Sequence, residues 1–354
     1  MNTELSTLGF DAWFEQRAAD SLQPAYRPAR ITAVDREAFL VRHPAGEIRA
    51  ELAGKFRYAA RSALDLPCVG DWVAVQWPDS GGPALIHQLL PRKTFLRRKS
   101  PGKTVDFQLI AANIDVAFII QAVPHDFNIH RLERYLVMAH EGRLAPHIIL
   151  SKTDLIAAEE LARLIAEIRA AGITAPVLPL SNSTGAGLDD FRALLAPGRT
   201  YCLLGSSGVG KSTLINRLAG KEVLDTQAVS GTGEGTHTTT RRQLLLLESG
   251  AMLIDTPGMR ELGLLGTGAG MDTTFRDIGD YAAQCRFPDC THTQEPGCAV
   301  LAALETGELD DARYQSFLKL KKEADFHNLS YAEKRQKDRA FGKFIKTAKK
   351  QLRK

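Results

Sequence analysis

The sequence predicts a multidomain α/β protein whose central part is a mostly parallel β-sheet with helices on both faces. Three observations support this fold class. Short apolar runs alternate with amphipathic helical patterns between about residue 115 and residue 255. A glycine-rich loop stands between one such run and the next helical pattern, and a cysteine-rich segment follows farther along the chain. Since 354 residues suffice for two or three cores, we expect further domains on either side of the sheet.

The central region divides into alternating strands and helices. The patterns predict strands at 115–121, 146–150, 176–180, 199–204 and near 243–247 and 251–255, and helices at 130–141, 156–171, 187–195 and 211–219. Ligands of such sheets bind beyond the carboxyl ends of the strands. Polar residues that directly follow a strand are therefore the candidates for a functional site.

The glycine-rich loop matches G-x-x-x-x-G-K-[ST] at every fixed position. In this pattern backbone N–H groups surround phosphate oxygens at a helix N-terminus. Lys211 is expected to reach the β- and γ-phosphates, and Ser212 to bind Mg²⁺. A turn that merely starts a helix would have no use for this Lys-Ser pair. The predicted phosphate-binding residues are Gly205, Ser206, Ser207, Gly208, Val209, Gly210, Lys211, Ser212 and Thr213.

A second motif, Asp-Thr-Pro-Gly, begins at the end of the last apolar run. An aspartate at the end of a buried strand is costly unless a cation or hydrogen-bond donors satisfy it, and Mg²⁺ is the expected partner of Asp255. Gly258 would let a backbone N–H approach the γ-phosphate. A plain strand-ending turn is the alternative, and the phosphate loop upstream argues against it.

The segment 231–240 is too rich in glycine and threonine for a core element, so it predicts a loop. Switch loops of GTPases carry a threonine that binds Mg²⁺ only when the γ-phosphate is present. Thr238, Thr239 and Thr240 are the candidates, and we select Thr239 as a catalytic and Mg²⁺-binding residue. A solvated linker is the alternative for each individual residue.

The motif that would select the base lies upstream of the phosphate loop. The carboxylate of Asp154 can accept from N1 and N2 of guanine, which adenine does not offer, and the stem of Lys152 can lie along the base. Residues that follow the next strand would form a second base-contacting loop. The ligand is therefore expected to be GTP or GDP, and its predicted base-side residues are Ser151, Lys152, Thr153, Asp154, Ser181 and Asn182.

The cysteine-rich segment has the spacing C-x₄-C-x-H-x₅-C. Four soft or borderline ligands in one short loop fit a closed tetrahedral Zn²⁺ site, and a site without an open position would be structural. Three of the chain's five cysteines fall in this segment, which argues against scattered core cysteines. The predicted ligands are Cys285, Cys290, His292 and Cys298.

An ordinary GTPase carries its base motif after the phosphate loop, and the reversed order here resembles the circularly permuted GTPases. Within them the chain is similar, over nearly its whole length, to the ribosome small-subunit-dependent GTPase A family, most specifically from Gln284 to Cys298. The resemblance implies an OB-type barrel, a permuted P-loop GTPase and a zinc-bearing helical C-terminal domain. It also implies GTP hydrolysis in late small-subunit maturation, stimulated by that subunit, with Mg²⁺ and one structural Zn²⁺.

The expected domain boundaries follow from this resemblance. They are an N-terminal extension at 1–27, the barrel at 28–100, the permuted GTPase at 105–270 and the zinc domain with a basic tail at 271–354. For the barrel, the sequence itself offers only short β-like stretches between polar turns, at 29–34, 38–41, 47–50 and 71–75.

The residue after the Asp-x-x-Gly motif is a departure from most regulatory GTPases. They carry there a glutamine that orients the attacking water, whereas this chain has Met259, which has no donor to offer. His237 in the threonine-rich loop is the nearest polar candidate, and the family has a histidine at this place. We assign His237 a catalytic role as a hypothesis, with a solvated loop histidine as the alternative.

Net charge is only +4, but basic residues gather in two places. One is the tail from Lys334 to Lys354, and both suggest contact with rRNA phosphates, with a solvated surface as the alternative. The second group of basic residues comprises Arg92, Lys93, Arg97, Arg98, Lys99 and Lys103.

No apolar run approaches the ~20 residues that span a bilayer, so we expect a cytoplasmic protein without a membrane partner. Nothing in the sequence demands more than a monomer.

Two other functions stay open. A P-loop ATPase or kinase would share the phosphate loop, although the motif ending in Asp154 argues against adenine. A nonenzymatic zinc protein that binds RNA would be consistent with Met259, although the intact phosphate loop argues against it.

Overall fold

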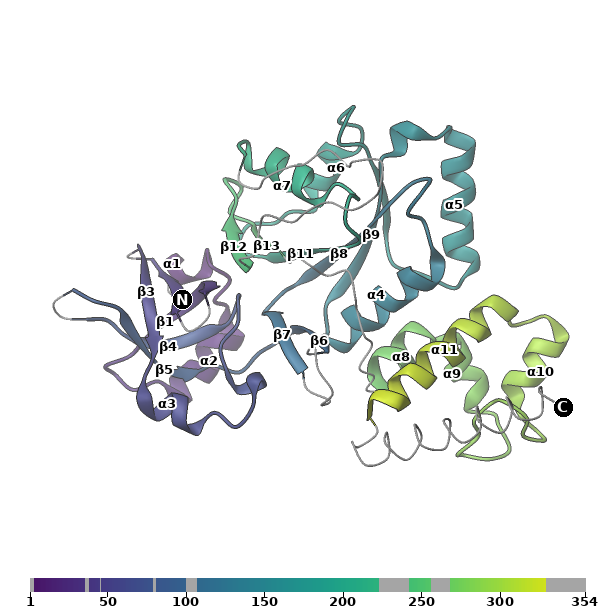
Figure 1. Cartoon of the computed structure of the whole chain (residues 1–354), viewed down its shortest axis with the longest axis horizontal. Coiled ribbons are helices and arrows are strands. Elements are labelled where there is room, and N and C mark those ends of the chain that lie inside the picture. Colours follow the sequence, from purple (N-terminus) through teal and green to yellow (C-terminus); the bar gives the residue numbers. More distant parts are fainter. Residues whose placement is uncertain are drawn as a thin grey trace, which may run out of the picture. The chain divides into compact units, whose positions relative to one another are not determined.

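The computed structural model (Figure 1) describes residues 3–35, 38–44, 46–78, 81–99, 107–222, 242–255 and 268–328. The chain forms two compact units. The first joins Met1–Arg97 to Leu109–Leu262, and the second joins Arg98–Gln108 to Gly263–Lys354. The domain boundaries expected from the sequence stay predictions, since the first unit holds both the barrel and the central sheet.

The first unit begins with two helices that the sequence analysis had left as an extension, α1 (Thr3–Ser6) and α2 (Ala12–Ser21). Asp11 caps α2 by accepting hydrogen bonds from the backbone N–H groups of Trp13 and Phe14. Apolar side chains of this segment are buried with Trp72 and Leu90 in one cluster. The N-terminal helices therefore cover part of the barrel wall.

The barrel has five strands, of which the sequence predicted four. They are β1 (Arg27–Asp35), β2 (Ala38–His43), β3 (Gly46–Leu52), β4 (Trp72–Gln76) and β5 (Ala84–Leu89). They pair in the order β1-β2-β3-β5-β4, and β4 returns to β1, which closes the barrel. Between β3 and β4 lie α3 (Gly54–Ala59) and η1 (Ala63–Asp65). This closed five-stranded barrel confirms the OB-type prediction.

The central sheet confirms the predicted alternation of strands and helices. Its order is β10-β9-β8-β11-β13-β12, in which only β12 is antiparallel to its neighbour. Its strands are β8 (Val116–Ala122), β9 (Ala145–Ser151), β10 (Val177–Leu180), β11 (Thr200–Leu204), β12 (Arg242–Leu246) and β13 (Met252–Asp255). The helices that connect them are α4 (Ile129–Glu141), α5 (Ala158–Ala170), α6 (Leu188–Ala193) and α7 (Lys211–Ala219).

Successive side chains of β8 enter two different cores, as the period of a strand requires. Ala117 and Ile119 are buried with residues of α4 and α5, whereas Phe118 and Ile120 are buried with residues of α6 and α7. The sheet is thus covered by two helices on each face. This arrangement leaves the carboxyl ends of the parallel strands free to form a site.

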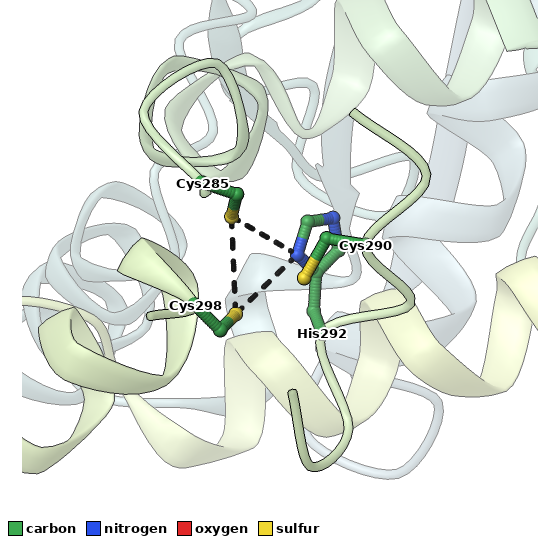
Figure 2. A group of neighbouring side chains, drawn as sticks. All are labelled: Cys285, Cys290, His292 and Cys298. Atoms are coloured by element: carbon green, nitrogen blue, oxygen red, sulfur yellow. Dashed lines mark hydrogen bonds between the residues drawn. The ribbon is translucent and has the colours of Figure 1, made fainter. Parts of the chain in front are cut away.

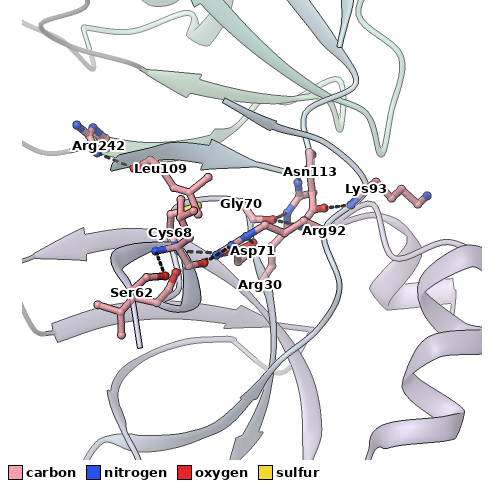
Figure 3. A network of polar contacts seen from close by, with 12 residues as sticks. Arg30, Ser62, Cys68, Gly70, Asp71, Arg92, Lys93, Leu109, Asn113 and Arg242 are labelled. Carbon is pink, nitrogen blue, oxygen red and sulfur yellow. Dashed lines mark hydrogen bonds and ion pairs between the residues drawn. The ribbon is translucent and has the colours of Figure 1, made fainter. Parts of the chain in front are cut away.

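The barrel and the central sheet share hydrogen bonds. β1 pairs antiparallel with β12, with Ala33 opposite Gln243, which makes one continuous sheet. Beside this pairing the guanidinium of Arg30 is fully buried and donates to five acceptors in separate segments. These acceptors are Leu8 O, Gly70 O at 3.3 Å, Asn113 O at 3.0 Å, Thr200 Oγ1 at 2.8 Å and Met252 Sδ at 3.2 Å. Figure 3 shows two of the residues that accept from it, Gly70 and Asn113.

Burial lowers the pKa of Arg30 to about 10, although the charges of Asp115 and Asp71 oppose this shift. A buried cation is tolerated when its donors are satisfied, as they are here. Thr200 begins β11 and Met252 begins β13, so Arg30 joins the barrel to the amino ends of two strands of the central sheet.

The second unit is helical in its described C-terminal part. Its helices are α8 (Gly268–Thr274), α9 (Arg276–Ala282), α10 (Ala299–Thr306) and α11 (Asp311–Asn328). Arg313 on α11 pairs with Asp277 on α9 at 2.8 Å and donates to Thr274 O at 2.7 Å. Nowhere in the described part of the chain is there a helix with the length and apolar character to cross a membrane.

Candidate functional site

The candidate site lies at the carboxyl edge of the central sheet. Ser151 ends β9, Ser181 follows β10, Gly205 follows β11 and Asp255 ends β13. These strands are parallel to one another in the order β10-β9-β8-β11-β13, so their carboxyl ends meet at one edge. The sheet therefore brings together segments that the sequence separates, and the order of motifs along the chain does not alter the pocket.

The phosphate loop needs its glycines because of its backbone geometry. Gly205, Gly208 and Gly210 have φ angles of 153°, 79° and 94°, which disfavour residues with a side chain. A Cβ atom at Gly205 would lie 2.3 Å from the carbonyl oxygen of Ile120 on β8. The loop is thus folded tightly against the strand ends before α7 begins at Lys211.

Side chains donate hydrogen bonds to three carbonyls of this loop. Lys211 Nζ donates to Gly205 O at 2.8 Å and to Ser206 O at 2.6 Å. Ser151 Oγ donates to Val209 O at 2.8 Å. In a trans peptide the C=O and the following N–H point in opposite directions, so a hydrogen bond to a carbonyl also fixes the direction of the next N–H. This geometry is compatible with the predicted phosphate site, whose residue assignments stay predictions.

The base-side residues form a connected group. Ser181 Oγ donates to Asp154 Oδ1 at 2.5 Å and also accepts from the backbone N–H of Thr184 at 3.1 Å. Lys152 adopts a left-handed backbone conformation with φ of 59°, which starts the short 3₁₀-helix η2 (Thr153–Leu155) that carries Asp154. The orientation of the Asp154 carboxylate is consequently fixed by Ser181. Asn182 Nδ2 reaches the phosphate loop instead and donates to Gly210 O at 3.0 Å.

Ser212 and Asp255 are the described candidates for Mg²⁺. Ser212 lies in the first turn of α7, and Asp255 is a buried carboxylate at the end of β13, beside the strand that leads into the loop. Hydroxyl and carboxylate oxygens are ligands that Mg²⁺ accepts. Thr239, its neighbours Thr238 and Thr240, His237, Gly258 and Met259 lie outside the described residues.

The structure adds a polar group that the sequence analysis missed. Asp126 follows β8, whose end lies between β9 and β11, and pairs with Arg131 at 2.8 Å. Burial raises the pKa of Asp126, while the charge of Arg131, the hydroxyl of Ser206 and the charge of Lys211 oppose the rise. Tyr135 also reaches Ser206, and burial raises its pKa to about 12. An aspartate shortly after a strand of the same sheet was the available signal.

The four predicted zinc ligands converge in the second unit (Figure 2). Their ligand atoms all lie within 4.8 Å of one another. Cys285 Sγ and Cys298 Sγ are 3.9 Å apart, and each lies 3.6 Å from His292 Nδ1. A tetrahedral ion with Zn–S of about 2.3 Å and Zn–N of about 2.0 Å requires about 3.8 Å between sulfurs and about 3.5 Å between sulfur and nitrogen. The donor set and its spacing therefore fit Zn²⁺.

Contacts around the cluster hold these side chains in place. Tyr314 on α11 donates its hydroxyl to the carbonyl oxygen of His292 at 2.6 Å. The backbone N–H of Leu301 donates to Cys298 Sγ at 3.5 Å. The carboxylate of Glu295 accepts from the backbone N–H groups of Thr291 and Thr293, each at 3.0 Å. Such supporting contacts are typical of structural metal sites.

The basic group after the barrel is mostly engaged within the chain. Arg92 forms a two-point pair with Asp71 at 2.8 and 2.7 Å, and Lys93 pairs with Asp11. Arg97 pairs with Glu141 at 2.7 Å, and Arg98 donates to the side chain of Gln108. Lys103 and the basic tail lie outside the described residues. The charge of this group therefore serves internal contacts in the described part of the chain.

Comparison with known proteins gives a consistent result. A family model described as RsgA GTPase matches residues 89–265. A protein named small ribosomal subunit biogenesis GTPase RsgA from Opitutus terrae is 43% identical over 329 residues, which cover 90% of this chain and 89% of the relative. The RsgA 1 of Bacteroides thetaiotaomicron is 38% identical over 351 residues, which cover 99% of this chain and 98% of the relative.

Two solved structures share the fold. The crystal structure of YjeQ from Thermotoga maritima has a TM-score of 0.64 and 27% identity, and the match covers 84% of this chain and 98% of that one. The structure of YloQ, described as a circularly permuted GTPase, has a TM-score of 0.62 and 24% identity, with 86% of this chain and 97% of that one covered.

Proposed function

The chain belongs to the RsgA GTPase family, and from this premise we propose that it binds the small ribosomal subunit and hydrolyses GTP late in that subunit's maturation. It is a GTP-hydrolysing enzyme of small-subunit biogenesis, like the relatives that carry this name. One observation carries the nucleotide assignment. The base-side motif, the phosphate loop and Asp255 meet at one sheet edge although their order along the chain is permuted.

We propose that hydrolysis proceeds by in-line attack of water on the γ-phosphate. Lys211 would turn one of its ammonium hydrogens to the β- and γ-phosphates while it keeps its hold on Gly205 O and Ser206 O. Backbone N–H groups of the loop would bind the remaining phosphate oxygens. Ser212, Asp255 and Thr239 would hold Mg²⁺, which neutralises charge that develops on the phosphates. Asp154, fixed by Ser181, would read the guanine edge.

The attacking water needs a partner, because Met259 offers no donor. We propose His237 for this role when the small subunit is bound. Single-turnover hydrolysis by His237→Ala in the presence of small subunits tests it, with GTP affinity measured alongside. A rate that stays at the wild-type value with intact GTP binding would rule His237 out.

We propose that rRNA is contacted through α3 of the barrel, in addition to the basic tail. Tyr58 on this helix is 94% exposed, and Lys55, Arg57 and Arg61 beside it are also exposed. An exposed aromatic ring among cations suits base stacking and phosphate contact, and stacking contributes about 1–3 kcal/mol per base. Tyr58→Ala should weaken subunit binding, and affinity should fall steeply with added salt. A flat salt dependence would count against an RNA contact.

The decisive experiment is multiple-turnover GTP hydrolysis with and without purified small subunits. Strong stimulation is expected, and its absence would require a different partner. Competition between GTP and ATP for binding separates a GTPase from an ATPase or kinase. We further propose that the chain acts as a monomer in the cytoplasm, where small subunits are assembled, and its mass in solution tests the monomer.

A further inference from the structure

We propose that Asn182 is a positioning residue that couples the base-side loop to phosphate binding by aiming the backbone N–H of Lys211 at the phosphates. The inference rests on the proposed binding of GTP and GDP. It assigns the side chain of Asn182 to the phosphate loop, although its place after β10 predicts a contact with the base.

The contact that carries the inference joins two loops far apart in the sequence. Asn182 Nδ2 donates to Gly210 O at 3.0 Å, and the same oxygen accepts from the backbone N–H of Leu214 at 3.0 Å, within the first turn of α7. A Cβ atom added to Gly210 would lie 2.8 Å from Nδ2, so the amide lies directly against the loop. The bare backbone at this position makes the approach possible.

The consequence follows from peptide geometry. The carbonyl of Gly210 and the N–H of Lys211 belong to one planar trans peptide, so they point in opposite directions. Two donors on the carbonyl limit the rotation of this plane. The Lys211 N–H belongs to the first turn of α7, whose N–H groups point toward the N-terminal end of the helix, where anions bind. Asn182 thereby fixes a donor that it does not itself supply.

The hydrogen bond to Gly210 O also sets the orientation of the Asn182 side-chain amide. Its Oδ1 is buried and finds no hydrogen-bond partner among the residues that the structure describes. A buried acceptor without a partner is unfavourable, so the bond from Nδ2 to Gly210 O is what orients this amide. Ser181 and Asn182 thus divide the work of one loop. Ser181 fixes the base-reading carboxylate, and Asn182 fixes a phosphate-binding N–H.

The test compares GDP with inosine diphosphate, which lacks the 2-amino group of guanine. Asn182→Asp keeps the shape of the side chain but sets an acceptor against the carbonyl of Gly210. It should weaken the binding of both nucleotides about tenfold, and Asn182→Ala about threefold, with the ratio of the two affinities unchanged. Asp154→Asn is the contrasting variant, since it should change that ratio. Ser183→Ala, an exposed neighbour in the same loop, should leave both affinities at the wild-type value.

Three outcomes would overturn the inference. One is unchanged GDP affinity in both Asn182 variants. Another is a ratio of GDP to inosine diphosphate affinity that shifts as far as it does in Asp154→Asn, which would make Asn182 a base-reading residue. The third is a fall of more than about 5 °C in the melting temperature of the nucleotide-free variants, which would show a general role in folding. If the wild-type chain bound neither nucleotide, the proposed function itself would fail, and that result is distinct from all three.

Discussion

The phosphate loop and the zinc loop use their side chains in opposite ways. In the phosphate loop, side chains of Lys211, Ser151 and Asn182 donate to backbone carbonyls and so fix the orientation of the peptide groups. In the zinc loop the side chains themselves meet at one point, within 4.8 Å of one another. The first arrangement suits an anion that is bound and released, and the second suits an ion that stays.

The surroundings of the two loops differ in the same sense. The phosphate loop joins β11, which contributes to the large cores on both faces of the central sheet, to α7, which contributes to one of them. The zinc loop joins α9 to α10 in a smaller helical unit. Small cores often need a metal to stay folded, whereas a large α/β core does not. The comparison predicts that each site can be lost without the other.

The largest expected effect is the loss of zinc. Cys298→Ser, or treatment with a strong chelator, should unfold the helices around the cluster, because structural Zn²⁺ contributes on the order of 10 kcal/mol in small domains. Helix content measured by circular dichroism and zinc content by mass spectrometry check this. GDP affinity should stay near the wild-type value. A parallel loss of GDP binding would show that the two sites are not independent.

The converse change is Lys211→Ala. Because this removes the cation that faces the phosphates, GTP affinity should fall at least about a hundredfold, or ~3 kcal/mol. Titration calorimetry measures it, and zinc content should stay at one ion per chain if the proposed site is right. Lys221→Ala, just beyond α7, is the control and should bind GTP normally. Retention of full affinity by Lys211→Ala would contradict the assignment of the loop.

A third change tests the buried contacts of Arg30, which join the barrel to the central sheet. Arg30→Met would leave the acceptors on Gly70, Asn113 and Thr200 without their buried donor, so we expect a loss of about 2–3 kcal/mol in unfolding free energy. Urea denaturation of the zinc-loaded protein measures it. Arg163→Met, at an exposed pair with Glu160, should leave the denaturation midpoint unchanged. Equal midpoints for the two variants would rule out Arg30 as a structural hub.

The smallest expected effect concerns Glu295, whose carboxylate accepts hydrogen bonds from backbone N–H groups of the zinc loop. Glu295→Gln replaces a carboxylate that accepts from the Thr291 hydroxyl and from three backbone N–H groups. The Thr291 hydroxyl above all, and then the backbone N–H groups of Gln294 and Thr291, hold the pKa of Glu295 well below its usual range. We expect zinc to dissociate about threefold faster, as for a lost supporting contact. A colorimetric chelator follows the release. Glu305→Gln on α10 is the control, and a rate equal to it would show that the Glu295 carboxylate does not matter.

Short-range patterns predicted most of the fold and much of the site. The strands and helices of the central sheet follow from their hydrophobic periodicity, and the zinc ligands from their spacing. The strand Ala84–Leu89 was missed because only its pairing with β3 and β4 makes it a strand. The basic group after the barrel suggested RNA contact, but the fold brings Asp71, Asp11 and Glu141 to its cations.

The contacts of Asn182 and Asp126 with the phosphate loop could not be predicted for a similar reason. Asn182 meets Gly210 across 28 positions of the chain. The place of Asp126 after β8 makes it a candidate, but that place alone does not show that Asp126 meets Ser206. A motif records which residues face a ligand. A motif does not show which other residues position the ligand-binding ones, because those contacts depend on which strand ends lie side by side in the sheet.

The pairing of β1 with β12 has a consequence for protein engineering. A strand at the border of a sheet exposes unpaired N–H and C=O groups that can recruit other chains. Here β1 occupies the side of β12 that β13 does not. Excision of the barrel to obtain a minimal catalytic fragment would therefore leave one edge of β12 without a paired strand. Such a fragment is expected to self-associate through this edge. A charged substitution at an exposed position of the uncovered strand, such as Leu246→Lys, would be the first step toward a fragment that stays monomeric.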